Sequence, residues 1–332
     1  MDDGEVKSVD LYDVALKWTA TFFAKNLLVE SKVVLGSVVV EGTSGNTVLS
    51  MDFETDTTDK SIAEQKANLL LTGLKSMLCL FMNKPLVLEL SDLKLLNSDD
   101  VKNKPALKLI SLEPFIKEKL LAPVEFKKEN IESIKRIYDL MYPDKLQFLN
   151  VTDYQLHYCL LTALHWYSKA MYENVLSDQL VDLWISFNAM YSFIWKKKYG
   201  SLSYEMSMAN YFIVKSDILS SVECKKILDD HPHVVHEVIP ERGQKEYSIK
   251  TFGKKEWKKY YNNSYGFDFW EHYDKEQWNE ALTEVICYIY GVRNSIFHGN
   301  WLPNNSEYLS ESISVLNDVI NPMLQRLVES LN

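Results

Sequence analysis

Apolar and polar residues follow two different spacings along this chain, and the first part carries the shorter one. Runs rich in valine and other β-branched residues at 32–40 and 47–53 predict two strands, with segment 41–46 as the hairpin loop between them. Residues 60–82 instead carry apolar side chains every three or four positions, which predicts a helix. Further strands are expected at 85–90 and 106–112.

From about residue 126 the apolar residues keep helical spacing over long stretches. Helices are predicted at 131–141, 153–173, 177–199, 204–215, 221–229, 276–298 and 308–331. Pro322 falls inside the last of them and predicts a kink or a split. Long amphipathic helices must bury their apolar stripes against one another. The sequence therefore predicts an α+β domain over residues 1–125, followed by an all-α helical bundle over residues 126–332.

Composition narrows the class of protein. An apolar fraction of 46% with 25% charged residues is typical of a globular chain. The net charge of -10 does not support attraction of nucleic acid by the whole surface, so any phosphate binding must come from a local patch. The four cysteines form no CxxC pair, the first residues lack the pattern of a secretory signal, and the most apolar stretch, 69–82, is too short to cross a bilayer. We expect a cytoplasmic protein with reduced thiols and no membrane contact.

The helix predicted at 276–298 carries the residues most suited to chemistry. Its apolar stripe consists of Trp278, Leu282, Val285, Ile289, Val292 and Ile296. At about 100° per residue, Arg293, Asn294 and His298 all point away from that stripe, and Tyr290, Asn294 and His298 form one row along the helix. Gly299 suits a left-handed C-cap, which would put His298 on the last turn. Carbonyl groups there favour the charged imidazole, so we expect them to raise the pKa of His298.

These residue types are suited to a narrow range of reactions. An arginine can hold a phosphate through two hydrogen bonds, and a histidine can accept or donate a proton. Together they suffice to cleave RNA by attack of the neighbouring 2′-hydroxyl, a reaction that needs a base, an acid and charge stabilisation but no metal. Only four of the 36 basic residues are arginines, so an arginine at 293 indicates a use for its planar geometry. One chain supplies a single such histidine, and a two-fold dimer would supply both acid and base.

At these residues the chain resembles the HEPN superfamily, whose signature is an arginine, a polar residue and a histidine in an R-x(4–6)-H frame. RNSIFHG at 293–299 is most similar to the Apea-like HEPN group, and residues 181–194 are similar to the helix that precedes the motif there. The resemblance extends from about residue 126 to the C-terminus. An acidic residue is common in that group where Asn188 stands here, so a supporting role for this position is in question.

The resemblance implies a metal-independent endoribonuclease that acts as a dimer, often in bacterial toxin or antiphage defence. His298 would then be the acid or base, Arg293 the phosphate clamp, Asn294 the residue that orients them and Tyr290 a substrate contact. No cofactor or metal is implied. The expected partners are an RNA substrate, a second copy of the chain, and an antitoxin or activating ligand.

Several other interpretations compete with this one. In the plainest of them, Arg293 pairs with a carboxylate and His298 only caps its helix. In another, the chain is a non-catalytic HEPN binding or sensor module whose N-terminal half is the recognition domain. Neutralisation by nucleotide transfer to a tyrosine two residues after the motif histidine is disfavoured, because that position is Asn300.

Three further segments carry both a structural and a functional interpretation. Lys196-Lys197-Lys198 is a solvated helix end or a phosphate site, and the segment 254–278, rich in lysine and aromatic residues, is a packed insertion or a base-stacking surface. The histidines at 231, 233 and 236 are expected in a surface loop rather than around a metal. In each case the sequence favours the structural interpretation.

Overall fold

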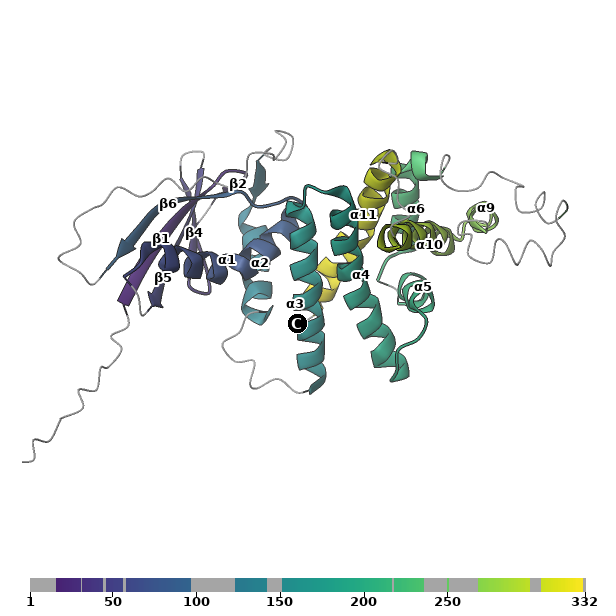
Figure 1. The fold of residues 1–332 in the computed structure, drawn as a ribbon, viewed down its shortest axis with the longest axis horizontal. Helices are drawn as coiled ribbons and strands as arrows, with labels where there is room; N and C mark the ends of the chain where they lie inside the picture. The colour runs from purple at the N-terminus through teal and green to yellow at the C-terminus, as the bar shows by residue number, and fades with distance from the viewer. Residues whose placement is uncertain are drawn as a thin grey trace, which may run out of the picture. The chain divides into compact units, whose positions relative to one another are not determined.

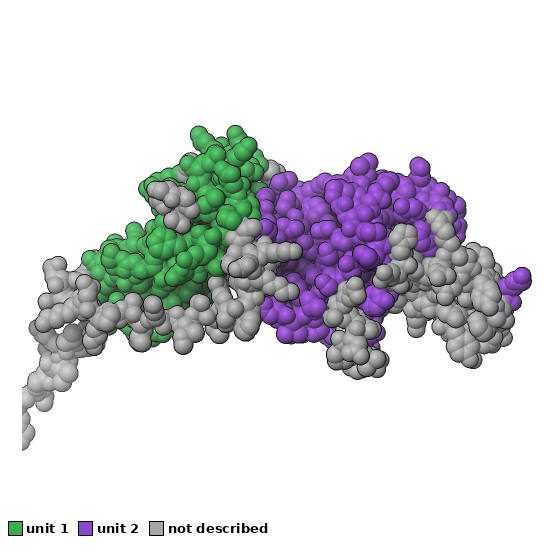
Figure 2. Space-filling model, turned by 90° about the horizontal axis from the view of Figure 1, so that it is seen from above, with its two compact units in different colours: residues 1–75, 86–139 green, residues 76–85, 140–332 purple. Residues whose placement is uncertain are grey.

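The computed structural model describes residues 16–30, 32–43, 46–55, 58–96, 123–141, 151–216, 218–235, 250, 268–298 and 306–330 (Figure 1). Two compact units divide the chain (Figure 2). The first consists of Met1–Lys75 and Leu86–Asp139, and the second of Ser76–Pro85 and Leu140–Asn332. The first is rich in strands and the second is helical, which confirms the coarse fold expected from the sequence. The predicted domains were continuous segments meeting at residue 125, whereas both units are discontinuous.

The first unit is built on a five-stranded antiparallel sheet with the order β3-β4-β5-β1-β6. Its strands are β1 (Leu16–Ala24), β3 (Val33–Leu35), β4 (Val38–Thr43), β5 (Asn46–Thr55) and β6 (Leu88–Leu95). Alternate residues of β1, including Trp18, Ala20 and Phe22, are buried, as expected for a sheet with one covered face. β1 itself was not among the predicted strands. A second, parallel pair joins β2 (Leu27–Val29) to β7 (Val124–Phe126).

The strand predicted at 32–40 is wrong. Residues 32–40, predicted as a single strand, form the two strands β3 and β4, which pair through Leu35 and Val38. Gly36 lies between them with a φ of 56°, a conformation that favours glycine, so the chain reverses there. The hairpin predicted around segment 41–46 is confirmed by the antiparallel pairing of β4 with β5. The strand predicted at 85–90 begins later, at Leu88, and the one predicted at 106–112 lies outside the described residues.

Helix α1 (Lys60–Met82) has both of its predicted ends. Asp59 accepts a hydrogen bond from the backbone N–H of Ser61 at 2.7 Å, which satisfies one of the free donors at the helix start. Ala63, Ala67, Leu71 and Leu74 on this helix are fully buried. The first unit also holds most of α2 (Lys128–Met141), which begins three residues before the predicted helix 131–141.

The second unit is a bundle of helices that matches the predicted helical stretches closely (Figure 1). It consists of α3 (Val151–Tyr172), α4 (Leu176–Tyr199), α5 (Glu205–Lys215), α6 (Ser221–Asp230), α9 (Phe269–Asp274), α10 (Trp278–Phe297) and α11 (Ser306–Glu329). α4 packs against α3 and α11, and α10 packs against α5, α6 and α9. Of the kink or split predicted at Pro322, the split is wrong. α11 continues through this residue, with Ile320 and Met323 fully buried on either side.

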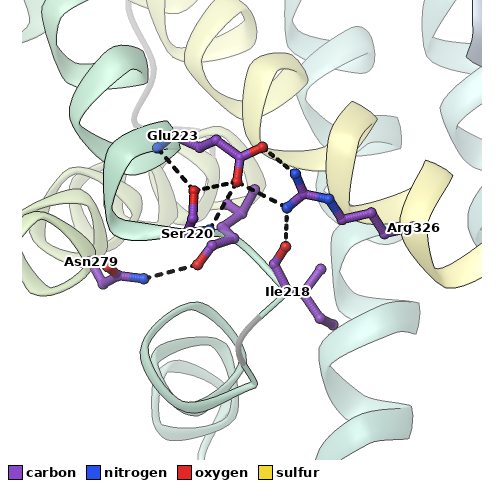
Figure 3. A network of polar contacts seen from close by, with 6 residues as sticks. Ile218, Ser220, Glu223, Asn279 and Arg326 are labelled. Carbon is purple, nitrogen blue, oxygen red and sulfur yellow. Dashed lines mark hydrogen bonds and ion pairs between the residues drawn. The ribbon is translucent and has the colours of Figure 1, made fainter.

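A polar network fastens the start of α6 to α10 and α11 (Figure 3). Ser220 caps α6 and exchanges hydrogen bonds with Glu223. The carboxylate of Glu223 also accepts hydrogen bonds from both terminal nitrogens of Arg326. Arg326 donates in addition to the backbone carbonyl of Ile218. The amide of Asn279, in the first turn of α10, donates to the carbonyl of Leu219 at 3.3 Å. These contacts fix the N-terminal end of α10. Within the described ranges, no helix has the length and apolar character needed to cross a bilayer.

Candidate functional site

Helix α10 carries the predicted motif beside its apolar stripe. Four residues of its predicted apolar stripe are buried, namely Leu282, Val285, Ile289 and Val292, while Trp278 and Ile296 at the two ends are half-buried. Arg293 and Asn294 are half-buried and His298 is exposed. The outward direction that helical periodicity predicted holds for His298, whereas Arg293 turns towards Glu205 of the neighbouring helix α5.

The carboxylate of Glu205 is the polar centre beside α10. Glu205 begins α5, and its Oε1 accepts hydrogen bonds from three side chains of α4: Trp184 Nε1 at 2.8 Å, Tyr191 Oη at 2.7 Å and Asn188 Nδ2 at 3.3 Å. Its other oxygen, Oε2, lies 4.0 Å from Arg293 Nη1. Burial raises the pKa of Tyr191, and its hydrogen bond to Glu205 raises it further, so this phenol remains a donor. The carboxylate is thus held in place largely by α4 and faces the arginine of α10.

Arg293 is surrounded by groups that fix its plane. Its Nη1 donates to Asn294 Oδ1 at 2.9 Å, and its guanidinium carbon lies 4.3 Å from the centre of the Phe297 ring and 6.0 Å from that of Tyr290. The Tyr290 ring in turn lies 5.6 Å from that of Trp184. Arg293 Nε is buried and has no hydrogen-bond partner among the described residues. The guanidinium is therefore oriented by its neighbours, and its unpartnered Nε donor is buried rather than open to a ligand.

His298 lies at the end of the same helix and outside this cluster. It is the C-cap residue, with a φ of -88°, and its backbone N–H donates to the carbonyl of Asn294 at 3.0 Å. Its imidazole is exposed and has no hydrogen-bonding partner in the described part of the chain. Gly299, the predicted left-handed cap, lies outside the described residues. The structure therefore brings Tyr290, Arg293 and Asn294 together and leaves His298 at an exposed end.

The arrangement can hold an anion next to a proton-transfer group. The 4.0 Å separation of Glu205 and Arg293 exceeds the 2.7–2.9 Å typical of a strong charge-assisted hydrogen bond. A phosphate that offers two oxygens to the guanidinium would therefore meet an arginine that is only partly engaged. If His298 at the exposed helix end serves as the acid or base, this histidine and the cluster together have the components for phosphodiester chemistry. One chain supplies only one such imidazole.

Sequence reasoning missed the residues that come from other helices. Glu205 was not singled out, although it stands in the first turn of a predicted helix, where acidic residues are common for helix-dipole reasons alone. Asn188 was singled out because an acidic residue was expected there. In the structure its amide donates to Glu205, so a carboxylate occupies the same neighbourhood but is supplied by α5. Local sequence patterns do not reveal that a carboxylate expected on one helix is supplied by another.

Of the histidines at 231, 233 and 236, the structure describes the first two. His231 is buried, not in a surface loop as expected, and its Nε2 forms a hydrogen bond of 2.9 Å with Asp318 of α11. His233 is exposed, and His236 lies outside the described residues. Within the described ranges no group of three or more histidine, cysteine or acidic side chains could hold a metal ion.

Fold and site together define a strand-rich unit joined to a helical bundle that carries an Arg-Asn pair and a terminal histidine on one helix. Comparisons with protein-family models, with curated proteins and with solved structures found no match to this chain. The function of the chain is therefore inferred from its fold, its site geometry and the residues of its motif.

Proposed function

We propose that the helical unit is a HEPN-like endoribonuclease that cleaves RNA without a metal ion. One observation carries the proposal: Arg293 is oriented by Asn294 and lies 4.0 Å from its only carboxylate neighbour among the described residues, and His298 lies exposed at the end of the same helix. The resemblance of residues 293–299 to the motif of that superfamily supports it. We expect such an enzyme to serve in bacterial toxin or antiphage defence, under the control of an antitoxin or an activating ligand.

In the proposed reaction Arg293 donates hydrogen bonds to the non-bridging oxygens of the scissile phosphate. One neutral imidazole accepts the proton of the 2′-hydroxyl, and the 2′-oxygen forms a bond to phosphorus. The bond from phosphorus to the 5′-oxygen breaks, and a protonated imidazole donates its proton to that leaving oxygen. The products are a 2′,3′-cyclic phosphate and a 5′-hydroxyl. No oxidant, reductant or second substrate is needed.

Glu205 and Asn294 have positioning roles in this scheme. Asn294 accepts from Nη1 of Arg293 at 2.9 Å, which turns the guanidinium plane, and Glu205 keeps the charge compensated while no phosphate is bound. When RNA arrives, its phosphate replaces the longer contact to Glu205, and the carboxylate remains anchored by Trp184 and Tyr191. Tyr290 packs on Trp184 beside Arg293, and in this scheme its ring edge contacts the bound nucleotide.

The second imidazole comes from a second copy of the chain. Phe297 is 56% exposed and stands directly before His298, so the helix end that bears the histidine also offers an apolar contact surface. A two-fold dimer formed at this end would cover Phe297 and bring the partner's His298 towards the first. One imidazole would then act as the base and the other as the acid.

Cleavage of a labelled RNA by purified protein in the presence of EDTA tests the proposal. We expect Arg293→Ala and His298→Ala each to lower the rate at least about 100-fold, because each removes charge stabilisation or proton transfer. Arg136→Ala and His165→Ala, which change exposed residues on other helices, are the matched controls and should retain the wild-type rate. An RNA left intact by the wild-type protein, or cleaved equally by all four variants, would contradict the proposal.

The ion pair between Arg293 and Glu205 favours one alternative, a non-catalytic HEPN binding or sensor module. In that case the arginine has a structural role and His298 only ends its helix. The two functions differ in cells that express the protein. If growth arrest is unchanged by His298→Ala, the binding module is supported, whereas its loss with unchanged protein level supports the ribonuclease.

A further inference from the structure

Three aromatic rings gather where α4 ends beside α5. The Trp195 ring centre lies 4.2 Å from that of Tyr199 and 5.6 Å from that of Tyr211, and the two tyrosine rings lie 5.5 Å apart. Trp195 and Tyr211 are half-buried, whereas Tyr199 is 51% exposed. Tyr199 is therefore more exposed than its packing in the ring cluster requires. We call these three residues, together with Lys196 and Lys198, which flank the Trp195–Tyr199 face of α4, the aromatic–lysine patch.

The patch is positively charged on a chain whose net charge is -10. Its two lysines are exposed and form no ion pair with any carboxylate that the structure describes. Lys198 Nζ lies 5.8 Å from the centre of the Tyr211 ring, so one of the charges stands over the aromatic cluster. Lysines next to half-exposed rings form the combination that binds the backbone and the bases of single-stranded nucleic acid.

The position of the patch connects it to the candidate site. Trp195 is one turn along α4 from Tyr191, which donates to Glu205, and Tyr211 lies on α5, the helix that Glu205 begins. The two helices that hold the carboxylate opposite Arg293 therefore also carry the patch (Figure 1). In the proposed complex, an RNA strand whose phosphate lies at Arg293 continues along α4 to the aromatic–lysine patch.

We propose that the aromatic–lysine patch binds unpaired bases of the RNA strand next to the cleaved bond. This inference rests on the proposed ribonuclease function, whose substrate class it narrows to single-stranded RNA. A base can stack on Tyr199 only when it has left its own helical stack, so a duplex cannot use the rings. The lysines contact the backbone on either side of the stacked base and do not depend on its identity.

Binding of a fluorescent single-stranded oligonucleotide with 2′-O-methyl sugars tests the inference, because such an oligonucleotide cannot be cleaved by 2′-hydroxyl attack. We expect Tyr199→Ala to weaken binding about fivefold or more and Tyr199→Phe to preserve it, since stacking needs the ring and not the hydroxyl. Changing Lys196 and Lys198 to alanine should lower the slope of log affinity against log salt by roughly 1.4. Tyr158→Ala, which removes a tyrosine of α3 that is 65% exposed, is the matched control.

The result separates this inference from the proposed function. If wild-type protein binds the oligonucleotide, loses affinity with Tyr199→Ala and still cleaves no natural RNA, the patch is supported and the ribonuclease is not. If RNA is cleaved but Tyr199→Ala binds and cleaves like wild type, the patch has another role and the inference fails. Equal affinity for single-stranded and duplex oligonucleotides, or no binding by the wild-type protein, would overturn it as well.

Discussion

At the scale of single residues, the surroundings of Glu205 decide how Arg293 is presented. Two donors to its carboxylate, Trp184 and Tyr191, are fully buried, so they have no access to water if the carboxylate is removed. Glu205 therefore has two separable roles. It satisfies buried donors of α4, and it balances the charge of Arg293.

These roles are separated by two substitutions. Glu205→Ala leaves two buried donors unsatisfied and should lower the free energy of unfolding by about 2–4 kcal/mol. Glu205→Gln keeps an acceptor oxygen for them and should cost about 1 kcal/mol, while it removes the charge opposite Arg293. Urea unfolding measures both, with Glu271→Gln on the surface expected to change stability by less than about 0.5 kcal/mol. Equal losses for the two Glu205 variants would mean that the hydrogen bonds do not matter.

The sequence predicts part of this site for a physical reason. Arg293, Asn294 and His298 lie on one helix, so their directions follow from its periodicity and from the buried positions of Ile289 and Val292. Glu205 reaches Arg293 from another helix, across a chain separation that no local spacing encodes. The contact of Phe297 with the guanidinium is different, because the two residues are four apart on one helix and the spacing alone makes them neighbours.

At the scale of elements, the Glu223–Arg326 contact ties the start of α6 to α11. Hydrogen bonds from Arg326, with smaller contributions from Ser220, lower the pKa of Glu223 from 4.5 to about 2 against an opposing effect of burial. Because the folded-state pKa lies below the usual value, the contact stabilises the fold above about pH 4.5. The stabilisation is lost as the pH falls towards 2 and the carboxylate is protonated.

Glu223→Gln should therefore lower the free energy of unfolding at neutral pH, and its difference from wild type should shrink as the pH falls from 4.5 towards 2. Urea unfolding at a series of pH values measures this difference. In an Arg326→Met background the same substitution should lose most of its effect, because the partner is gone. A difference from wild type that stays constant down to pH 2 would contradict the assignment.

Elements differ in how well their sequence predicts them. The helices of the second unit were predicted because their apolar stripes repeat over many turns, and their ends are marked by residues such as Gly200, which has a φ of 77°. β3 and β4 are short, and they were predicted as one strand because the valines on both sides of Gly36 continue the strand-like pattern across the turn. β1 was not predicted, although buried and exposed residues alternate regularly along it. One of its exposed positions is the apolar Phe23, which obscures the alternation of apolar and polar residues in the sequence.

At the scale of the whole molecule, the proposed enzyme is a dimer in which each site needs an imidazole from both protomers. This requirement has a quantitative consequence when active and inactive chains are mixed. Random pairing in an equal mixture yields about a quarter of pairs with two wild-type chains. Only those pairs would be fully active.

Equal amounts of wild-type and His298→Ala protein, allowed to exchange protomers, should therefore cleave RNA at about a quarter of the rate of the same total amount of wild type. Chains with self-sufficient sites would keep about half of that rate. The control is an equal mixture with His165→Ala, which should retain the full rate because this histidine lies on α3, away from the motif. The mass in solution should be twice 38.6 kDa, and a monomer of full activity would exclude the shared site.

The most direct test of the proposed reaction uses one RNA whose cut is first mapped and a copy that lacks the 2′-hydroxyl only at that nucleotide. Attack by this hydroxyl predicts that the copy resists cleavage at the mapped bond, while the original yields a 2′,3′-cyclic phosphate and a 5′-hydroxyl with EDTA present. Mass spectrometry of the fragments identifies both ends. Cleavage of the copy at the same bond, or 5′-phosphate ends from the original, would contradict a site built from Arg293, Asn294 and His298.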